Sequence, residues 1–127
     1  MTEDEIGTYI VDAAIKVHRD VGPGLLESVY EVILAWELRS RGLYVCRQVP
    51  VPVRYHNFQF EEGFKADLLV ENKVIVELKC VEKINNSHKK QLLTYLRLGN
   101  KNLGYLLNFS EALMKNGISR KVNCLKE

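Results

Sequence analysis

The sequence predicts an α/β (α+β) fold in which helices flank a central mixed sheet, and changes in hydrophobic periodicity are the main evidence. Apolar residues recur at helical spacing through about residue 41, and the pattern is strand-like from 44 to 80. Helical spacing then returns to about residue 98, before a last apolar strand-like run. The expected order is two helices, four strand-like segments, a helix and a strand. We expect one domain over residues 1–127, since a chain of this length can bury one core.

Two helices are expected in the first third of the chain. Thr2 and Glu5 form a capping-box pattern before a helix over residues 3–19. The segment 21–24, "VGPG", ends it, and a second helix is expected from about 25 to 41, with Gly42 as its C-terminal cap. The side chains expected to point inward are Ile6, Ile10, Ala13, Ala14 and Val17 in the first helix, and Leu26, Val29, Ile33, Leu34 and Leu38 in the second.

The strand-like region has its own local signals. Residues 44–55 are β-rich, but Pro50 and Pro52 favour an edge or irregular strand. A turn and a short strand are expected next, followed by strands at 64–70 and 74–80. Asn86 or Ser87 is expected to cap a helix that runs to about Leu98. Residues 103–109 read as a strand, and 117–123 as a last short strand or a fraying end.

Composition excludes several classes of protein. The net charge of +2 is lower than a dedicated electrostatic DNA binder usually carries. The cysteine count of three is odd and no pair has zinc-site spacing, which favours reduced thiols in a cytoplasmic protein. No apolar run approaches the ~20 residues of a membrane span, and the acidic N-terminus is not a signal peptide.

The stretch "ADLLVENKVIVELKC", residues 66–80, places three charges inside two apolar strands. A three-residue loop over 71–73 aligns the apolar residues of both strands on one side of the sheet, with Ala66 and Leu68 on the same face. On the opposite face, Asp67 then meets Glu77. Opposed like charges destabilise a sheet. Either neighbouring lysines neutralise them on a wet face, or a cation such as Mg²⁺ lies between them, and the pattern leaves both readings open.

Asp67, followed after nine residues by Glu77-Leu78-Lys79, resembles the D…(D/E)-x-K core of the PD-(D/E)XK nuclease superfamily, with Ala66 in place of the usual proline. The stretch "GLLESVY", residues 24–30, is a G-x-x-E-x-x-Y motif, and "QLLTY", residues 91–95, is a Q-x₃-Y motif. Together with "RQVPVPV", these motifs closely resemble the small GxxExxY proteins over about residues 5–122. The resemblance implies a restriction-endonuclease-like core and metal-dependent phosphodiester cleavage.

The resemblance also implies a metal site. Asp67 and Glu77 would hold Mg²⁺ (or Mn²⁺), helped by the backbone carbonyl of Leu78. Glu27 would be a third carboxylate, direct or through water, although an acid in a first helical turn is also favourable by itself. Lys79 would orient water and stabilise phosphate charge, with general base as a second possibility, because an unperturbed lysine is a poor base at neutral pH.

Two residues of the third helix complete the expected site. Gln91 and Tyr95 lie one turn apart and would contact the metal-bound water or the substrate backbone. The alternative interpretation is that Gln91 is an exposed surface residue without a function. His88, one turn before Gln91, is a weaker candidate. Tyr30 and Cys80 are expected to be packing residues.

The predicted function is that of a Mg²⁺-dependent nuclease acting on nucleic acid, with DNA as the expected partner, no membrane partner and a homodimer as a possible state. The alternative is a catalytically weak or inactive nucleic-acid-binding or protein-interaction module that keeps the fold. A glycosidase needs an acid–base pair of carboxyl groups with separated pKa values, and a lysine two residues from one carboxylate is not expected there.

Overall fold

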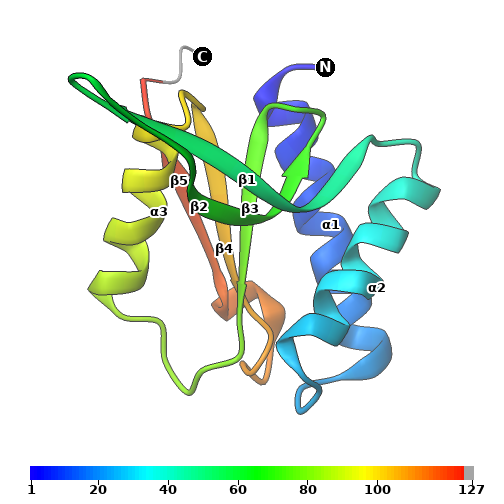
Figure 1. Cartoon of the computed structure of the whole chain (residues 1–127). Helices are drawn as coiled ribbons and strands as arrows, with labels where there is room; N and C mark the ends of the chain where they lie inside the picture. The colour runs from blue at the N-terminus through cyan, green and yellow to red at the C-terminus, as the bar shows by residue number, and fades with distance from the viewer. Residues whose placement is uncertain (125–127) are drawn as a thin grey trace.

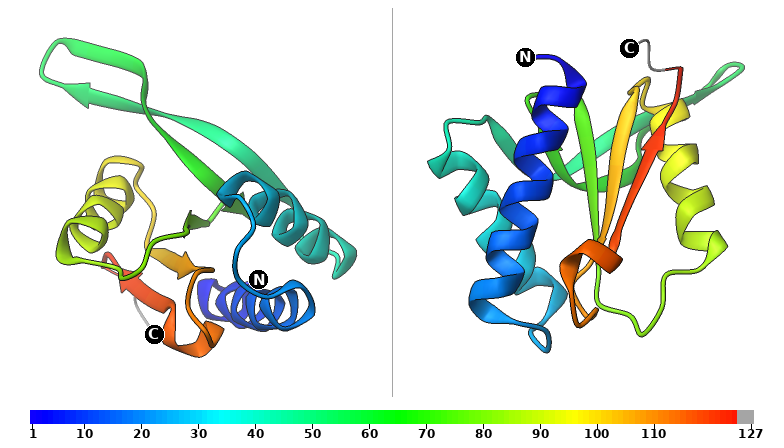
Figure 2. Two further views of the ribbon diagram at one scale, coloured as in Figure 1. Left: turned by 90° about the horizontal axis from the view of Figure 1, so that it is seen from below. Right: turned by 180° about the vertical axis from the view of Figure 1, so that it is seen from behind.

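A five-stranded mixed sheet with helices on both faces makes up the computed structural model, which describes residues 1–124 (Figure 1). The strand order is β1-β2-β3-β4-β5, with β3 and β4 parallel and the other neighbours antiparallel. Helices α1 and α2 cover one face and α3 the other (Figure 2). The elements are α1 (Glu3–Val21), α2 (Glu27–Ser40), β1 (Val45–Tyr55), β2 (Phe58–Val70), β3 (Val74–Lys79), α3 (Asn86–Leu98), β4 (Leu103–Asn108), the short 3₁₀ helix η1 (Met114–Asn116) and β5 (Ile118–Val122). The predicted fold class is confirmed.

Helix α1 agrees with its sequence pattern. The capping box between Thr2 and Glu5 is present, and all five residues expected to point inward are buried against the sheet. The helix runs two residues past the expected end and stops at Gly22, whose φ of 73° is a conformation that favours glycine. No helix in the described part of the chain is long and apolar enough to cross a membrane.

The inward face of helix α2 differs from the expected one at the start of the helix. Leu26 and Val29 were expected to point inward, but they are 73% and 38% exposed. The predictions for Leu34 and Leu38, which are buried, and for Ile33, which packs partly buried against the core, are confirmed. The other buried residues of the helix are Tyr30, Glu31, Ala35 and Glu37. Tyr30 sets this rotation, because its ring stacks on Phe109 with centroids 4.5 Å apart and its hydroxyl bonds the loop before the helix. That hydroxyl donates to the Gly22 carbonyl and accepts from the Leu25 N–H.

Strands β1 and β2 form one long hairpin, and its outer part projects beyond the rest of the sheet (Figures 1 and 2). We call this outer part, residues 52–62, the arm. The short strand expected after the turn and the strand expected at 64–70 are one continuous strand. As Pro50 and Pro52 indicated, β1 is an edge strand, and its pairing with β2 shifts register between Val51 and Val53.

The β2–β3 hairpin has the predicted register. Val70 pairs with Val74, Leu69 with Ile75 and Leu68 with Val76, so the three-residue loop is confirmed. The regular pairing then stops. Ala66 does not share a face with Leu68, as was expected, but packs with Leu69 and Ile75 on the α3 side. At this point the side chains of the β1–β2 hairpin change from one face of the sheet to the other. The cause is Gln48, which lies opposite Asp67 in β1 and whose φ of 51° inverts the alternation of side chains.

Helix α3 lies close against the sheet. It begins one residue earlier than expected, because Asn85 rather than Asn86 or Ser87 is the N-cap and accepts from the His88 N–H. Leu92 and Leu96 pack over Gly104 of β4, where an added Cβ would lie 3.0 and 3.1 Å from their methyl groups. The absence of a side chain at Gly104 therefore allows α3, which carries Gln91 and Tyr95, to approach the sheet.

Tyr30→Phe is expected to destabilise the protein by about 1–2 kcal/mol, because it keeps the ring stack but leaves the Leu25 N–H and Gly22 carbonyl without their side-chain partner. Chemical denaturation measures the change. Tyr9→Phe, at an exposed tyrosine of α1, is the matched control and should change stability by less than about 0.5 kcal/mol. An unchanged midpoint for Tyr30→Phe would contradict this account of α2.

Candidate active site

The centre of the candidate site is a pair of carboxyl groups from β2 and β3. Asp67 Oδ2 accepts a hydrogen bond from the backbone N–H of Leu78 at 2.9 Å, and Glu77 Oε2 accepts from the backbone N–H of Asp67 at 3.1 Å. Each carboxylate therefore binds a backbone group of the other strand just where the regular ladder ends. Because both side chains are fixed in this way, Asp67 and Glu77 lie side by side, as the register predicted.

Burial and crowding raise the pKa of Glu77 to about 9. Burial of a side chain that is only 7% exposed is the largest cause, and the neighbouring Asp67 carboxyl adds to it by hydrogen bonding and by charge. The Asp67 N–H and the Lys79 ammonium act in the opposite direction. At neutral pH the metal-free pair therefore keeps a proton, which removes the repulsion between the two acids.

Glu27 approaches this pair from the start of α2. Partial burial is the main cause that raises its pKa, and the Asp67 charge raises it further, whereas Lys79 and the Cys80 backbone lower it. Glu27, Asp67 and Lys79, from three different elements, are thus close enough to influence one another. Lys79 is half-buried, and within residues 1–124 no carboxylate lies within 4 Å of its ammonium group.

A second set of polar residues supports Asp67 from the β1 side. The Gln48 side-chain amide donates to Glu31 Oε1 at 2.6 Å and to Asp67 Oδ1 at 3.3 Å. Glu31, which is 5% exposed, also forms an ion pair with Arg47 at 3.0 Å. Sequence analysis missed these residues. Glu31 lies one turn after Glu27, which is the signal that could have placed it, but Gln48 depends on a positive φ that its sequence does not indicate.

The residues of α3 differ in how they relate to the pair. Tyr95 is half-buried and stacks on Phe64, with ring centroids 3.9 Å apart. Burial is the largest cause that raises its pKa, followed by the charges of Glu77 and Asp67, so its ring lies near both carboxyl groups. Gln91 is exposed, one turn before Tyr95, and its side chain makes no hydrogen bond to a described residue. His88 accepts from the Asn85 N–H through Nδ1, so its role here is to cap the helix.

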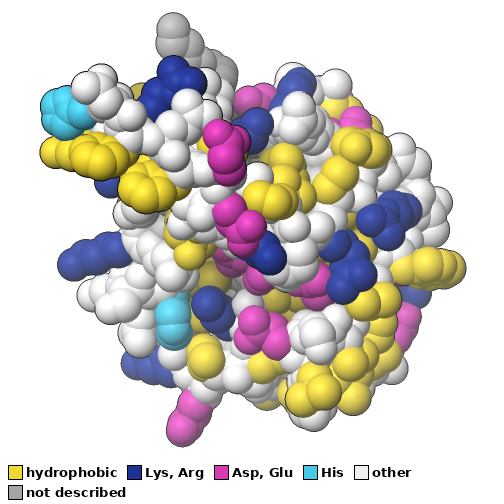
Figure 3. Space-filling model, viewed as in Figure 1, with side chains coloured by type: hydrophobic (Ala, Val, Ile, Leu, Met, Phe, Trp, Pro, Cys, Tyr) yellow, Lys and Arg dark blue, Asp and Glu magenta, His cyan; other side chains and the backbone are white. Residues whose placement is uncertain are grey.

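An open cleft of about 530 Å³ gives access to Asp67 between α2 and β1. It is lined by Leu26, Glu27, Ser28, Glu31, Arg47, Gln48 and Asp67. Acidic and basic side chains gather on this face of the molecule, below the arm (Figure 3).

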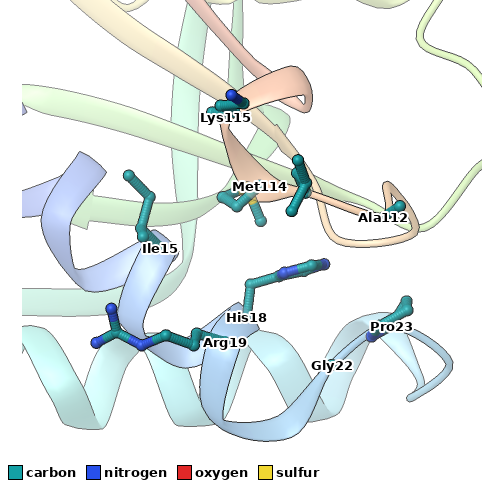
Figure 4. A pocket seen from close by; sticks show the side chains of 9 residues that line it. Ile15, His18, Arg19, Gly22, Pro23, Ala112, Met114 and Lys115 are labelled. Carbon is teal, nitrogen blue, oxygen red and sulfur yellow. The ribbon is translucent and has the colours of Figure 1, made fainter.

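A slightly larger cavity of about 570 Å³ lies near the end of α1, where His18 is positioned between that helix and residues 112–115 (Figure 4). Because no carboxylate lines that cavity, it does not compete as the catalytic centre.

The donor set suits a small, hard cation. Among residues 1–124, no group of three or more His, Cys, Asp or Glu side chains is arranged to hold a metal ion. The pair Asp67 and Glu77 supplies two carboxyl groups, and Leu78, whose N–H donates to Asp67 Oδ2, directly follows Glu77 in β3. Mg²⁺ binds through one or two carboxylates and retains several waters, so these residues fit it without a third acid.

The free energy of unfolding of the metal-free protein should fall between about pH 5 and pH 9. Glu77 has a higher pKa in the folded than in the unfolded chain, so the folded state binds more protons in this window and loses stability as pH rises. Glu77→Gln should remove much of this slope. Urea unfolding in chelator across the window measures the free energy of unfolding. We expect its loss between about pH 5 and pH 9 to be larger in the wild type than in Glu77→Gln by at least about 1 kcal/mol. Parallel curves would contradict a raised pKa at Glu77.

Comparison with known proteins agrees with this geometry. The family model of the PD-(D/E)XK nuclease superfamily matches residues 4–121, which include every candidate residue described above. No curated protein and no solved structure matched the chain. Because the match covers nearly all of the sequence and the fold is the one expected for that superfamily, the chain belongs to the PD-(D/E)XK nuclease superfamily.

Proposed function

We propose that this protein is a divalent-metal-dependent nuclease of the GxxExxY type that hydrolyses phosphodiester bonds in nucleic acid, with DNA as the expected substrate. The observation that carries the proposal is the meeting of Asp67, Glu77, Lys79 and Glu27 where the β2–β3 ladder ends. The superfamily match supports nuclease-like chemistry in general, and the residues supply the particular arrangement.

Asp67 and Glu77 would hold Mg²⁺ or Mn²⁺, together with the Leu78 carbonyl, and Glu27 would reach the same ion directly or through water. A bound divalent cation supplies Lewis-acid chemistry: it lowers the pKa of water and offsets charge on the phosphate. Gln48 is proposed as a positioning residue, because its amide fixes Asp67 Oδ1 against Glu31. Arg47 holds Glu31 from its other side and keeps that buried acid paired.

Lys79 is proposed to act on the substrate. Its side chain follows Glu77 by two residues in β3, so both point to the same face of the sheet. An ammonium group that no described ion pair occupies is able to bind a phosphate oxygen and to orient an attacking water. Gln91 and Tyr95 extend this surface along α3 and would contact the substrate backbone.

A second candidate function is nucleic-acid binding with little or no cleavage. The observation that favours it is the self-contained pair: both carboxyl groups already accept backbone hydrogen bonds, and residues 1–124 contain no group of three or more His, Cys, Asp or Glu side chains arranged to hold a metal ion. A module of this kind would keep the substrate contacts proposed for Lys79, Gln91 and Tyr95 and bind nucleic acid without turnover.

Activity should depend on Glu77 and Lys79 individually. With Mg²⁺ or Mn²⁺ and labelled single-stranded and duplex DNA, Glu77→Gln and Lys79→Ala should each lower the cleavage rate by at least about 100-fold, since each removes a group that acts on the transition state. The controls Asp12→Asn and Lys115→Ala change exposed residues elsewhere and should retain full activity. Substrate binding without cleavage by the wild type would favour the second candidate function.

Metal binding is tested separately by thermal stability, which requires no substrate. Mn²⁺ at about 100 times its Kd should stabilise the wild type by about 2.7 kcal/mol, and Glu77→Gln should lose most of this response. Glu77→Gln is a cleaner probe than Asp67→Asn, because the glutamine carbonyl still accepts from Asp67 N–H, whereas both Asp67 oxygens already accept hydrogen bonds. An equal response of wild type, Glu77→Gln and the control Asp12→Asn would reject the metal site.

A further inference from the structure

The arm carries aromatic side chains that the proposed chemistry does not use. Tyr55 and Phe58 are each 65% exposed, and Phe60 is 55% exposed. Tyr55 pairs directly with Phe58, and Phe60 pairs with Val53, so all four side chains lie on one face of the hairpin. Hydrophobic side chains and a histidine project at the tip of the arm, on the same face of the molecule as the acidic and basic side chains that gather below the arm (Figure 3).

This aromatic face continues to the candidate active site. Phe60, Phe64 and Tyr95 line one open cavity of about 390 Å³ between the arm and α3. Phe64 and Tyr95 are stacked within it, with their planes 7° apart, and Tyr95 lies near the carboxyl pair. At ~3.3 Å per residue, Phe60 is at most about 23 Å from Asp67 along β2. Tyr55, Phe58, Phe60, Phe64 and Tyr95 therefore form a continuous surface, which we call the aromatic track.

Positive charge runs beside the track. Helix α3 contains Lys89, Lys90 and Arg97 and no acidic residue, and within the described chain none of the three is in an ion pair. Arg97 and Arg54 line a neighbouring cavity, which shares Val53 and Leu98 with the cavity of the track. The arm itself contains two glutamates, Glu61 and Glu62, and Glu62 is paired with Lys65 at 3.3 Å.

We propose that the aromatic track binds single-stranded nucleic acid and leads it to the carboxyl pair, with bases stacked on the rings and phosphates near α3. This inference rests on the proposed function and specifies its substrate class. Exposed phenylalanine rings have no hydrogen-bonding group with which to read the edges of a base, but they stack on the faces of unpaired bases. In a duplex those faces are covered by neighbouring base pairs, so the rings match a single strand.

The test is fluorescence anisotropy in chelator, so that the intact protein binds without cleaving. The probes are a labelled oligothymidine of about 20 nucleotides and a duplex of the same length, at one fixed salt concentration. The double variant Phe58→Ala and Phe60→Ala should bind the oligothymidine about 10- to 100-fold more weakly than the wild type, with a smaller change for the duplex. Trp36→Ala, which removes a 66% exposed aromatic residue from α2, should bind like the wild type.

The possible results separate this inference from the proposed function. A wild type that binds neither probe overturns the track, and cleavage by that same protein in Mg²⁺ or Mn²⁺ would leave the nuclease proposal standing. A wild type that binds either probe, with affinities that the double variant leaves unchanged, overturns the track and leaves the nuclease proposal standing. If sedimentation shows that the double variant loses self-association while it binds oligothymidine normally, the track is a contact with a second copy of this chain and the inference is overturned. Circular dichroism confirms that each variant is folded.

Discussion

The arrangement of this molecule depends on how two strands separate. Where β2 leaves β3, the paired ladder ends at Leu68 and Val76, and the backbone N–H groups of Asp67 and Leu78 donate to side-chain carboxyl groups rather than to backbone carbonyls. A buried N–H without an acceptor is costly, and here two carboxyl groups act as acceptors. The side chains that allow the sheet to open are therefore the same ones that form the candidate site, so the divergence of the strands and the position of the pair have one cause.

The separation also arranges the surroundings of the pair. Because the β1–β2 hairpin turns over at Gln48 and Asp67, its inner part packs on α1 and α2 and its outer part packs toward α3. Asp67 lies at the change of face, where Glu27 and Glu31 approach from α2 and Tyr95 approaches from the other side. A flat hairpin would keep one face toward one layer of helices, and residues of both layers would not reach the same carboxylate.

What the sequence could predict follows from how local each signal is. The register of β2 and β3 from Leu68 and Val76 to the loop depends on alternation and loop length, which are local, and it was predicted correctly. The same reasoning placed Asp67 beside Glu77, although these two residues meet through side-chain hydrogen bonds beyond the end of the ladder. The face of Ala66 depends on the conformation of Gln48 in another strand, and the face of α2 depends on Tyr30 stacking on Phe109 from the opposite end of the chain. Such contacts between distant residues override hydrophobic spacing, which is why Leu26 and Val29 were assigned to the wrong side.

The charges inside an apolar hairpin are compatible with a stable fold because the pair has an alternative to ionisation. A buried pair of ionised carboxylates would be strongly unfavourable, but the raised pKa keeps a proton on Glu77, and backbone and amide donors bind the oxygens of Asp67. The metal-free fold therefore needs no cation to neutralise its site. Folding and ligand binding are then separable, in contrast to small zinc domains whose folding requires the ion, and removing the site chemistry need not remove the structure.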